Sequence, residues 1–215
     1  MDRTDMMHVM YDKKGPKVAE AFNKRAFEAY YCPTKEEALE KALSLIPKDD
    51  VISWGGSTSI NEIGLRPYVL EHGYKVINRD DAKDMAERME IMRQALLCDT
   101  YIMSSNAAVE DGQLFNIDGN GNRVAALCYG PKQVVGILGM NKIMPTVETA
   151  IARARSVAAP INVQRFDGTK TPCYLTGMCA DCTSPQSICA QMLRTRICKP
   201  AGRIKVIIVG ENLGF

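Results

Sequence analysis

The sequence lacks the features that mark several large classes of protein. It has no run of about eighteen consecutive apolar residues, so we expect no membrane-spanning helix. It also has no Lys- or Arg-rich stretch. Its 27 basic and 25 acidic residues leave a formal net charge of only +2, so we expect no nucleic-acid partner. The first residues lack the apolar stretch of a signal peptide, which predicts a cytoplasmic protein.

Histidine and nucleotide-binding motifs are also scarce. The chain has two histidines, His8 and His72, and we expect both to face solvent, which argues against histidine catalysis. Neither a Walker sequence nor Gly-x-Gly-x-x-Gly is present, so no motif supports nucleotide binding.

Helical and extended patterns alternate along the 215 residues, of which 46% are hydrophobic. Apolar strands are expected at 29–32, 51–54, 74–77, 100–103, 134–138 and 203–209, and helices at 17–28, 34–46, 60–71, 80–97 and 146–158. This order predicts an α/β fold with a mostly parallel sheet and helices on both faces. We expect an N-terminal tail at 1–13 and a single domain at 14–215, with 165–200 as a Cys-rich excursion.

Five local features refine this prediction. Residues 113–117 and 123–127 flank the turn Asp-Gly-Asn-Gly-Asn and predict a β-hairpin. Pro67 is expected to break the helix at 60–71, and Met85, Met89, Met92 and Leu96 are expected to face inward from the helix at 80–97. Thr183-Ser184-Pro185 is typical of a helix start that would place Cys189 one turn along. Cys32, Cys98 and Cys128 are expected in the core.

The turn after the strand at 51–54 is the first candidate site. It carries Gly55, Gly56, Ser57, Thr58 and Ser59 and leads into a helix. Backbone N–H groups at such a turn bind carboxylate or phosphate, and Asn61 and Glu62 in the first helical turns are placed to face a ligand. The alternative is that the glycines only permit the turn while a hydroxyl caps the helix.

A second group of polar residues follows the strand at 100–103. We interpret Ser105, Asn106 and Arg123 as ligand contacts, with Arg123 as a bidentate partner for a carboxylate, and Lys142 as a cation from a third loop. Acid–base catalysis would fall to Glu62, Glu110 or Asp111. A turn that satisfies its own polar groups and a solvated lysine are the alternatives.

Five of the eight cysteines lie between Cys173 and Cys198. Cys179 and Cys182 form a chelating pair, and Cys173 and Cys189 complete four thiolates, enough for zinc or an iron–sulfur cluster. Cys198 is a spare or alternative ligand. The spacing does not choose the metal, and a redox dithiol or unligated buried thiols remain alternatives.

Several of these motifs together resemble the LUD domain of lactate utilization proteins, over roughly residues 14–215. The motifs are Trp54-Gly-Gly-Ser-Thr-Ser59, Ser104-Ser-Asn-Ala107, Glu110-Asp-Gly112, Asn116-Ile-Asp-Gly-Asn-Gly-Asn-Arg-Val124 and Gly139-Met-Asn-Lys-Ile143. The resemblance implies a fold like that of glucosamine-6-phosphate deaminase, ribose-5-phosphate isomerase and the CoA transferases, with an anion bound at the Gly-Gly-Ser-Thr turn. It further implies a part in oxidising L-lactate to pyruvate with an iron–sulfur redox protein as partner.

We therefore expect a protein that binds a small anionic metabolite, and a homo-oligomer. The alternatives are an isomerase or acyl/CoA-transferase-type enzyme acting on a sugar phosphate or CoA ester with structural zinc, and a sensing module without turnover.

Overall fold

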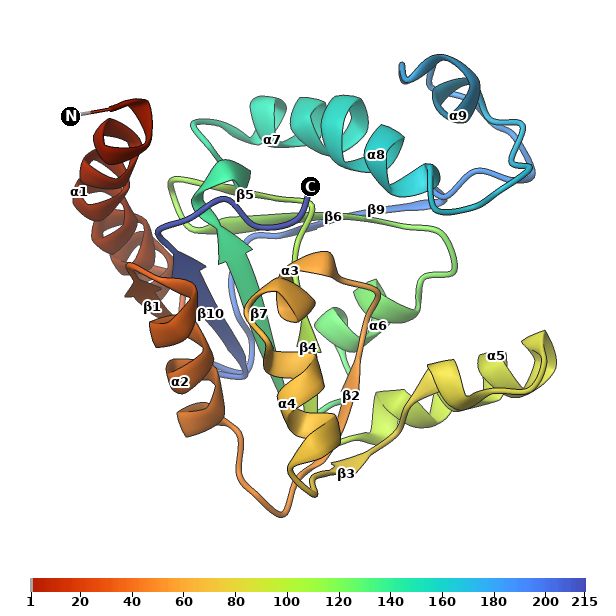
Figure 1. The fold of residues 1–215 in the computed structure, drawn as a ribbon, viewed down its shortest axis with the longest axis horizontal. Coiled ribbons are helices and arrows are strands. Elements are labelled where there is room, and N and C mark those ends of the chain that lie inside the picture. The colour runs from red at the N-terminus through yellow and green to blue at the C-terminus, as the bar shows by residue number, and fades with distance from the viewer. Residues whose placement is uncertain (1) are drawn as a thin grey trace.

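The computed structural model describes residues 2–215, which form an α/β fold with a mostly parallel main sheet (Figure 1). The main sheet has the strand order β1-β10-β7-β4-β2-β3, and all of its pairs are parallel. Its strands are β1 (Glu28–Cys32), β2 (Val51–Trp54), β3 (Lys75–Val76), β4 (Thr100–Met103), β7 (Gln133–Gly139) and β10 (Ile204–Val209). The predicted fold class is confirmed.

A second sheet lies beside the first, in the order β8-β5-β6-β9. Its strands are β5 (Ala107–Val109), β6 (Gln113–Asp118), β8 (Ile143–Met144) and β9 (Gln191–Thr195). β6 runs antiparallel to both β5 and β9, whereas β5 and β8 are parallel. The Cys-rich excursion therefore returns to the domain through β9, whose five residues all pair with β6.

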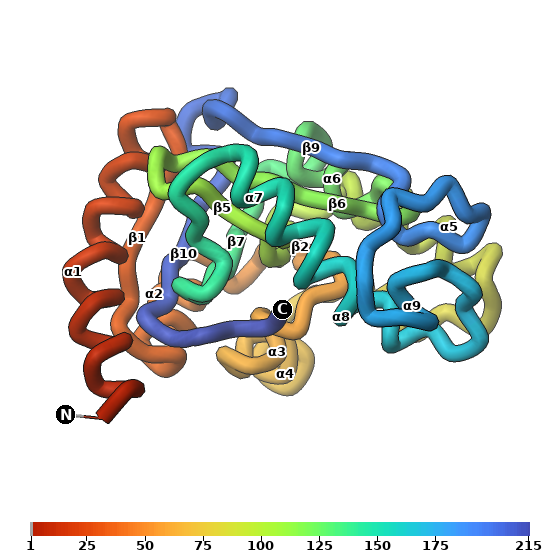
Figure 2. Tube along the Cα trace, turned by 90° about the horizontal axis from the view of Figure 1, so that it is seen from above, coloured from red at the N-terminus to blue at the C-terminus, as the bar shows by residue number. Residues whose placement is uncertain are grey.

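Helices cover both faces of the main sheet and the outer face of the second (Figures 1 and 2). The α-helices are α1 (Arg3–Lys24), α2 (Lys35–Leu45), α3 (Thr58–Glu62), α4 (Leu65–Glu71), α5 (Met85–Gln94), α6 (Asn122–Cys128), α7 (Val147–Arg153), α8 (Ala159–Val163) and α9 (Pro172–Thr176). Short 3₁₀ helices are η1 (Arg79–Asp81), η2 (Ala95–Leu97) and η3 (Met140–Lys142), and η4 (Ala154–Ala158) is a π-helical segment. None of the helices in residues 2–215 has the length and apolar character needed to span a membrane.

Alternation along β10 shows how the layers are built. Val206 and Ile208 point into a core shared with α1, α6 and the second sheet, whereas Ile207 and Val209 point into a core shared with α2, α3 and α4. Successive strand residues face opposite sides, so a fully apolar strand such as this one must be covered on both. A third cluster joins the outer face of the second sheet to α7 and η4.

The predicted hairpin is wrong in its second half. Residues 113–118 form β6, but the next segment is the helix α6, and the antiparallel partner of β6 that precedes it in sequence is β5. Asp118 decides this, because its carboxylate accepts hydrogen bonds from the backbone N–H groups of Arg123 (3.0 Å) and Val124 (3.3 Å) at the helix start. A short apolar run does not by itself separate strand from helix.

Other local expectations also differ from the structure. Residues 3–13, expected as a tail, belong to α1, which begins with a capping box at Asp2. The break in the helix at 58–71 falls at Gly64, and Pro67 lies in the first turn of α4, where its missing N–H costs nothing. Of the four residues expected to face inward near α5, Met85 and Met89 are exposed and Met92 is buried.

The expectations for the cysteines are also confirmed only in part. Cys32 and Cys98 are buried as predicted, but Cys128 at the end of α6 is exposed. The helix expected to start at Thr183 is absent, and Pro185 and Gln186 form only a turn.

Gly112 offers a stability test, because it turns β5 into β6 directly under α1. Its φ is +87°, and a Cβ there would lie 2.5 Å from the backbone of Ala21 and 2.6 Å from that of Phe22. Gly112→Ala should lower the free energy of unfolding by the roughly 1–2 kcal/mol cost of positive φ plus a clash of about 1–3 kcal/mol. Gly73→Ala is the matched control, because Gly73 has φ +71° and open space around it. Urea unfolding should therefore show a larger loss of unfolding free energy for Gly112→Ala than for Gly73→Ala. Equal losses in the two variants would show that the clash is absent.

Candidate functional site

The carboxyl ends of β2, β4 and β7 meet at one edge of the main sheet, where they open into a pocket of about 1100 Å³. The neighbouring order of these strands brings the loops after them together, at the edge where parallel α/β sheets bind ligands. Nine of the predicted ligand contacts line the pocket: Gly55, Gly56, Ser57, Thr58, Asn61, Ser105, Asn106, Arg123 and Lys142. The tenth, Ser59, lies behind Lys142 and is hydrogen-bonded to it.

Lys142 is buried at the base of this pocket, with 3% of its surface exposed. Its Nζ donates hydrogen bonds to the hydroxyls of Ser59 (2.9 Å) and Ser104 (3.1 Å). The pKa of the Lys142 ammonium is lowered to about 7, mainly by burial and in smaller part by the positive charges of Arg153 and Arg123, against the opposing effect of Glu62. A lysine held this way changes its charge near neutral pH.

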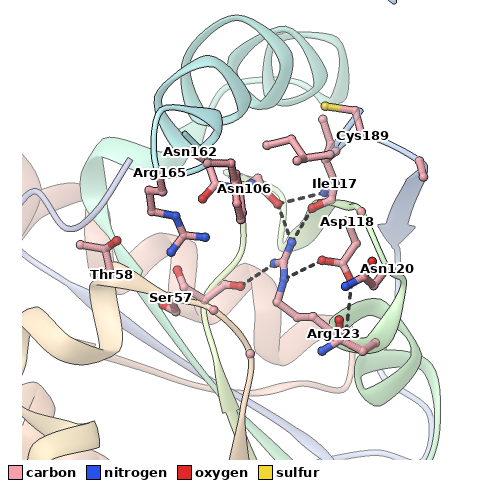
Figure 3. Close-up of a pocket in the computed structure, with 18 of the residues that line it drawn as sticks. Ser57, Thr58, Asn106, Ile117, Asp118, Asn120, Arg123, Asn162, Arg165 and Cys189 are labelled. Atoms are coloured by element: carbon pink, nitrogen blue, oxygen red, sulfur yellow. Dashed lines mark hydrogen bonds and ion pairs between the residues drawn. The ribbon is translucent and has the colours of Figure 1, made fainter. Parts of the chain in front are cut away.

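The Arg123 side chain reaches from α6 towards Asn106, Ile117 and Asp118 in the pocket wall, as Figure 3 shows. Its two terminal nitrogens donate hydrogen bonds to four oxygens, those of the Ser104 carbonyl (2.9 Å), the Asn116 side chain (2.6 Å), the Asn106 side chain (2.9 Å) and the Ile117 carbonyl (2.6 Å). Its Nε lies 3.5 Å from an Asp118 carboxylate oxygen. The four N–H groups of the terminal nitrogens are thus all used within the protein. The geometry favours a positioning role over the predicted bidentate contact to a substrate.

The two glycines of the turn are needed for close approach by arginine side chains. A Cβ on Gly55 would lie 2.8 Å from Cδ of Arg123, and a Cβ on Gly56 would lie 2.8 Å from Nη2 of Arg79. Helix α3, which follows, has only five residues, and its cap is the Ser57 hydroxyl, which accepts from the Ile60 N–H at 3.4 Å. The positive character of this loop therefore comes from arginine side chains.

Positive side chains outnumber negative ones in the pocket wall. The cationic residues are Arg66, Arg79, Arg88, Arg123, Arg165 and Lys142, and the acidic residues are Asp80 and Asp118. Asp80 pairs with Arg66 at 2.6 Å and with Arg88 at 3.1 Å, but its contact to Arg79 is 4.0 Å long. Within residues 2–215, neither Arg165 nor Lys142 forms an ion pair with a carboxylate.

Arg79 is a half-buried cation with little compensation, because its contact to Asp80 is 4.0 Å long. Its Nε has no hydrogen-bond partner in the described structure, and burial lowers the pKa of its guanidinium. Arg165 extends from the end of α8 into the same space, across from Arg123 (Figure 3). Sequence reasoning missed both arginines. Arg79 follows β3 at the same sheet edge, so a search of every strand's carboxyl end would have found it.

The three predicted catalytic carboxylates lie in different places. Glu62 accepts a hydrogen bond of 2.6 Å from the Gly214 N–H beside the pocket. Glu110 pairs with Lys14 at 2.6 Å and Asp111 pairs with Arg25 at 2.7 Å, so both carboxylates contact α1 or its C-cap instead of lining the pocket. The structure brings neither of the last two to the ligand side of the sheet.

The four cysteines predicted as ligands converge on a second, smaller cavity of about 40 Å³. The pKa of the Cys189 thiol is raised to about 11, mainly by burial and in smaller part by charge on the neighbouring sulfurs of Cys173, Cys179 and Cys182. Within residues 2–215, no three His, Cys, Asp or Glu side chains are arranged to hold a metal ion as they stand. Cys198 lies elsewhere, in the core that contains α1 and β10.

The two cavities share a wall. Cys182, Ser187, Ile188 and Cys189 line both the pocket at the sheet edge and the small cysteine cavity. This wall rests on the turn after β6, because a Cβ on Gly119 would lie 3.4 Å from Cα of Ile188.

Comparison with known proteins places the fold. Residues 16–209 match the LUD domain. Among solved structures, the chain is similar to a DUF162 family protein from Deinococcus radiodurans, with 14% identity, a TM-score of 0.52, and 93% of this chain and 98% of that chain covered. It also shows likeness to ribose 5-phosphate isomerase A from Neisseria gonorrhoeae, with 16% identity, a TM-score of 0.34, and 53% and 54% covered. The search of curated proteins finds no match.

Arg123→Lys tests the positioning role, because lysine keeps the charge but cannot reach four acceptors at once. We expect the free energy of unfolding to fall by roughly 3–5 kcal/mol, since buried acceptors would lose their donors. Arg165→Lys is the control, because Arg165 is exposed, and it should change stability by less than about 0.5 kcal/mol. Equal, small effects in urea unfolding would contradict the role.

Lys142 gives a pH-dependent stability test. Between the lowered pKa of about 7 and the ordinary value of 10.5, the unfolded chain binds more protons than the folded one. Lowering the pH through this range therefore weakens folding, and below it the penalty stays constant. Any advantage in melting temperature of Lys142→Met over wild type should be larger at pH 6 than at pH 9. A difference independent of pH would contradict the lowered pKa.

Proposed function

The chain belongs to the LUD domain family, and from that premise we propose that its pocket binds a small carboxylate, a 2-hydroxy or 2-oxo acid. We further propose that it takes part in oxidising L-lactate to pyruvate with an iron–sulfur redox protein as partner. The observation that carries the proposal is the excess of basic side chains in the pocket wall, which within residues 2–215 has five arginines and Lys142 but only two carboxylates, Asp80 and Asp118.

The excess matters because buried charge is costly unless it is compensated. Asp80 and Asp118 are already engaged by Arg66, Arg88 and Arg123. The half-buried Arg79 and the exposed Arg165 are left to face the cavity, where an anionic ligand would pair with both guanidinium groups. A planar carboxylate suits a guanidinium, which donates two parallel hydrogen bonds to it.

Lys142 and its two hydroxyl partners suit the other end of such a ligand. An oxygen on the carbon next to the carboxylate would meet Lys142 Nζ, which hydrogen bonds to the hydroxyls of Ser59 and Ser104 hold in place. With its pKa lowered to about 7, the Lys142 amine accepts a proton from a bound hydroxyl near neutral pH and returns it readily.

The oxidation balances with the named partner. In going from L-lactate to pyruvate, the C2–H and O–H bonds break and the C2–O bond becomes double. The hydroxyl proton would pass to the neutral Lys142 amine, the hydrogen on C2 would leave as a proton to water, and the iron–sulfur partner would supply the acceptor for the two electrons. This chain's own part is to bind the carboxylate, orient the C2–O bond and hold the proton.

The alternative is an isomerase or acyl/CoA-transferase-type enzyme on a sugar phosphate or CoA ester with structural zinc, or a sensing module. A pocket of about 1100 Å³ admits these larger ligands as well. The class of ligand that binds therefore separates the two proposals.

Calorimetric titration tests the proposal. Wild type should bind pyruvate or L-lactate but not the uncharged L-lactamide, and Arg165→Met should weaken binding by about tenfold or more, because a charge-assisted contact is lost. Lys132→Met is the matched control, because it removes one positive charge before β7, at the opposite edge of the sheet. If Arg165→Met and Lys132→Met bind the acid with equal affinity, the pocket is not the binding site.

Turnover separates the two proposals further. Pyruvate should form from L-lactate only when the chain and an iron–sulfur partner, or ferricyanide in its place, are both present, and Lys142→Met should slow the reaction. Binding of ribose 5-phosphate or a CoA ester without binding of either acid would favour the alternative enzyme.

A further inference from the structure

Four cysteines from a 17-residue stretch line one cavity at the surface of the Cys-rich segment. We propose that Cys173, Cys179, Cys182 and Cys189 form a four-thiolate site for a thiophilic metal centre, a zinc ion or an iron–sulfur cluster. The proposal does not depend on the function proposed above, because it concerns the cysteines and its readouts need no substrate.

The four sulfurs come from three separate pieces of backbone. Cys173 is buried in the first turn of α9, and Cys189 lies two residues before β9. Cys179 and Cys182 lie on the loop between these elements, which turns back at Asp181 with φ +51°. A non-glycine residue in the left-handed region is uncommon and marks a specific turn. This turn lets both loop cysteines line the same cavity.

The loop has few other interactions to hold it. Residues 177–190 contain no helix or strand, and their side chains are mostly exposed, with Met178 at 69%. Within the loop, Ser187 N–H bonds to the Ser184 carbonyl, and outside it Lys170 N–H bonds to the Gln186 side chain. A segment this poor in apolar contacts gains its order from a cross-link, and metal coordination supplies both the link and the folding energy.

Polar groups beside the sulfurs suit thiolates. Arg155 from η4 points its Nη2 to 3.9 Å from Cys179 Sγ and pairs with Asp181 at 2.5 Å. The Thr171 hydroxyl lies 3.5 Å from Cys173 Sγ. Four thiolates around a divalent ion carry surplus negative charge, and such neighbours offset the charge and orient the ligands.

Neither a disulfide nor inert burial accounts for these cysteines as well as a metal centre does. All eight cysteines are free thiols in the described structure, so no disulfide already fixes the loop. Inert core thiols occur singly among apolar side chains, as Cys98 does, whereas Cys179 is exposed and Cys182 is half-buried. Because no three ligands in residues 2–215 stand ready for an ion, loading must draw the sulfurs inward, and the loosely held loop is the part that moves.

The experiment is metal analysis of the full chain purified without oxygen from cells supplied with iron and zinc. We expect about one zinc, or about four iron with matching acid-labile sulfide and a broad visible absorption band, per chain. Cys179→Ser and Cys182→Ser should lose at least half of the metal. Cys128→Ser, an exposed cysteine outside the cavity, should keep it.

A second measurement holds even if the variants fold poorly. In the loaded wild type, four thiols should resist a thiol reagent until a chelator removes the metal. The protein will also be reconstituted with ferrous iron and sulfide, or with zinc. If it still binds less than about a tenth of an equivalent of either metal per chain, the proposal is wrong. Full metal retention in both loop variants, or disulfides among these cysteines in the oxygen-free preparation, would overturn it as well.

Discussion

The buried guanidinium of Arg123 holds the pocket together. It joins the end of β4, through the Ser104 carbonyl, to β6, through Asn116 and Ile117, and so fixes the second sheet against the first. Its positive charge also helps to keep the proton off Lys142. A single side chain therefore shapes the site and also contributes, after burial and Arg153, to the lowered pKa of its central amine. Gly55 has no side chain because the Arg123 side chain occupies that space.

The main sheet could be predicted because its strands are continuous apolar runs separated by helical patterns, as at 51–54, 100–103 and 204–209. The helix expected from residue 34 begins there, with Thr34 as the N-cap of α2, but the helix start expected at Thr183-Ser184-Pro185 is absent. Segments that depend on one distant or competing hydrogen bond could not be predicted. The run at 123–127 fits a strand or a helix equally well, and only the position of Asp118 against its backbone decides for α6.

The candidate site could likewise be predicted only in part. Residues in the loops after β2, β4 and β7 could be found because parallel strands end at a common edge. The partners of their side chains could not, since pairing is set by contacts distant in sequence. The terminal nitrogens of Arg123 donate all of their hydrogen bonds to acceptors within the protein. Glu110 forms an ion pair with Lys14, and Asp111 forms one with Arg25. Arg79 gave no signal beyond following a two-residue strand. The convergence of the cysteines on a single cavity likewise depends on where the loop turns.

The place of β10 has a consequence for how the chain acquires its structure. β1, near the beginning of the chain, pairs with β10, which is formed by residues 204–209, and β10 also separates β1 from β7. During synthesis, β1 therefore cannot pair with β10 until nearly all of the described residues have been made. Until then the apolar edge of β7 stays open to other chains, so folding of this domain is expected to be slow and sensitive to crowding by nascent copies.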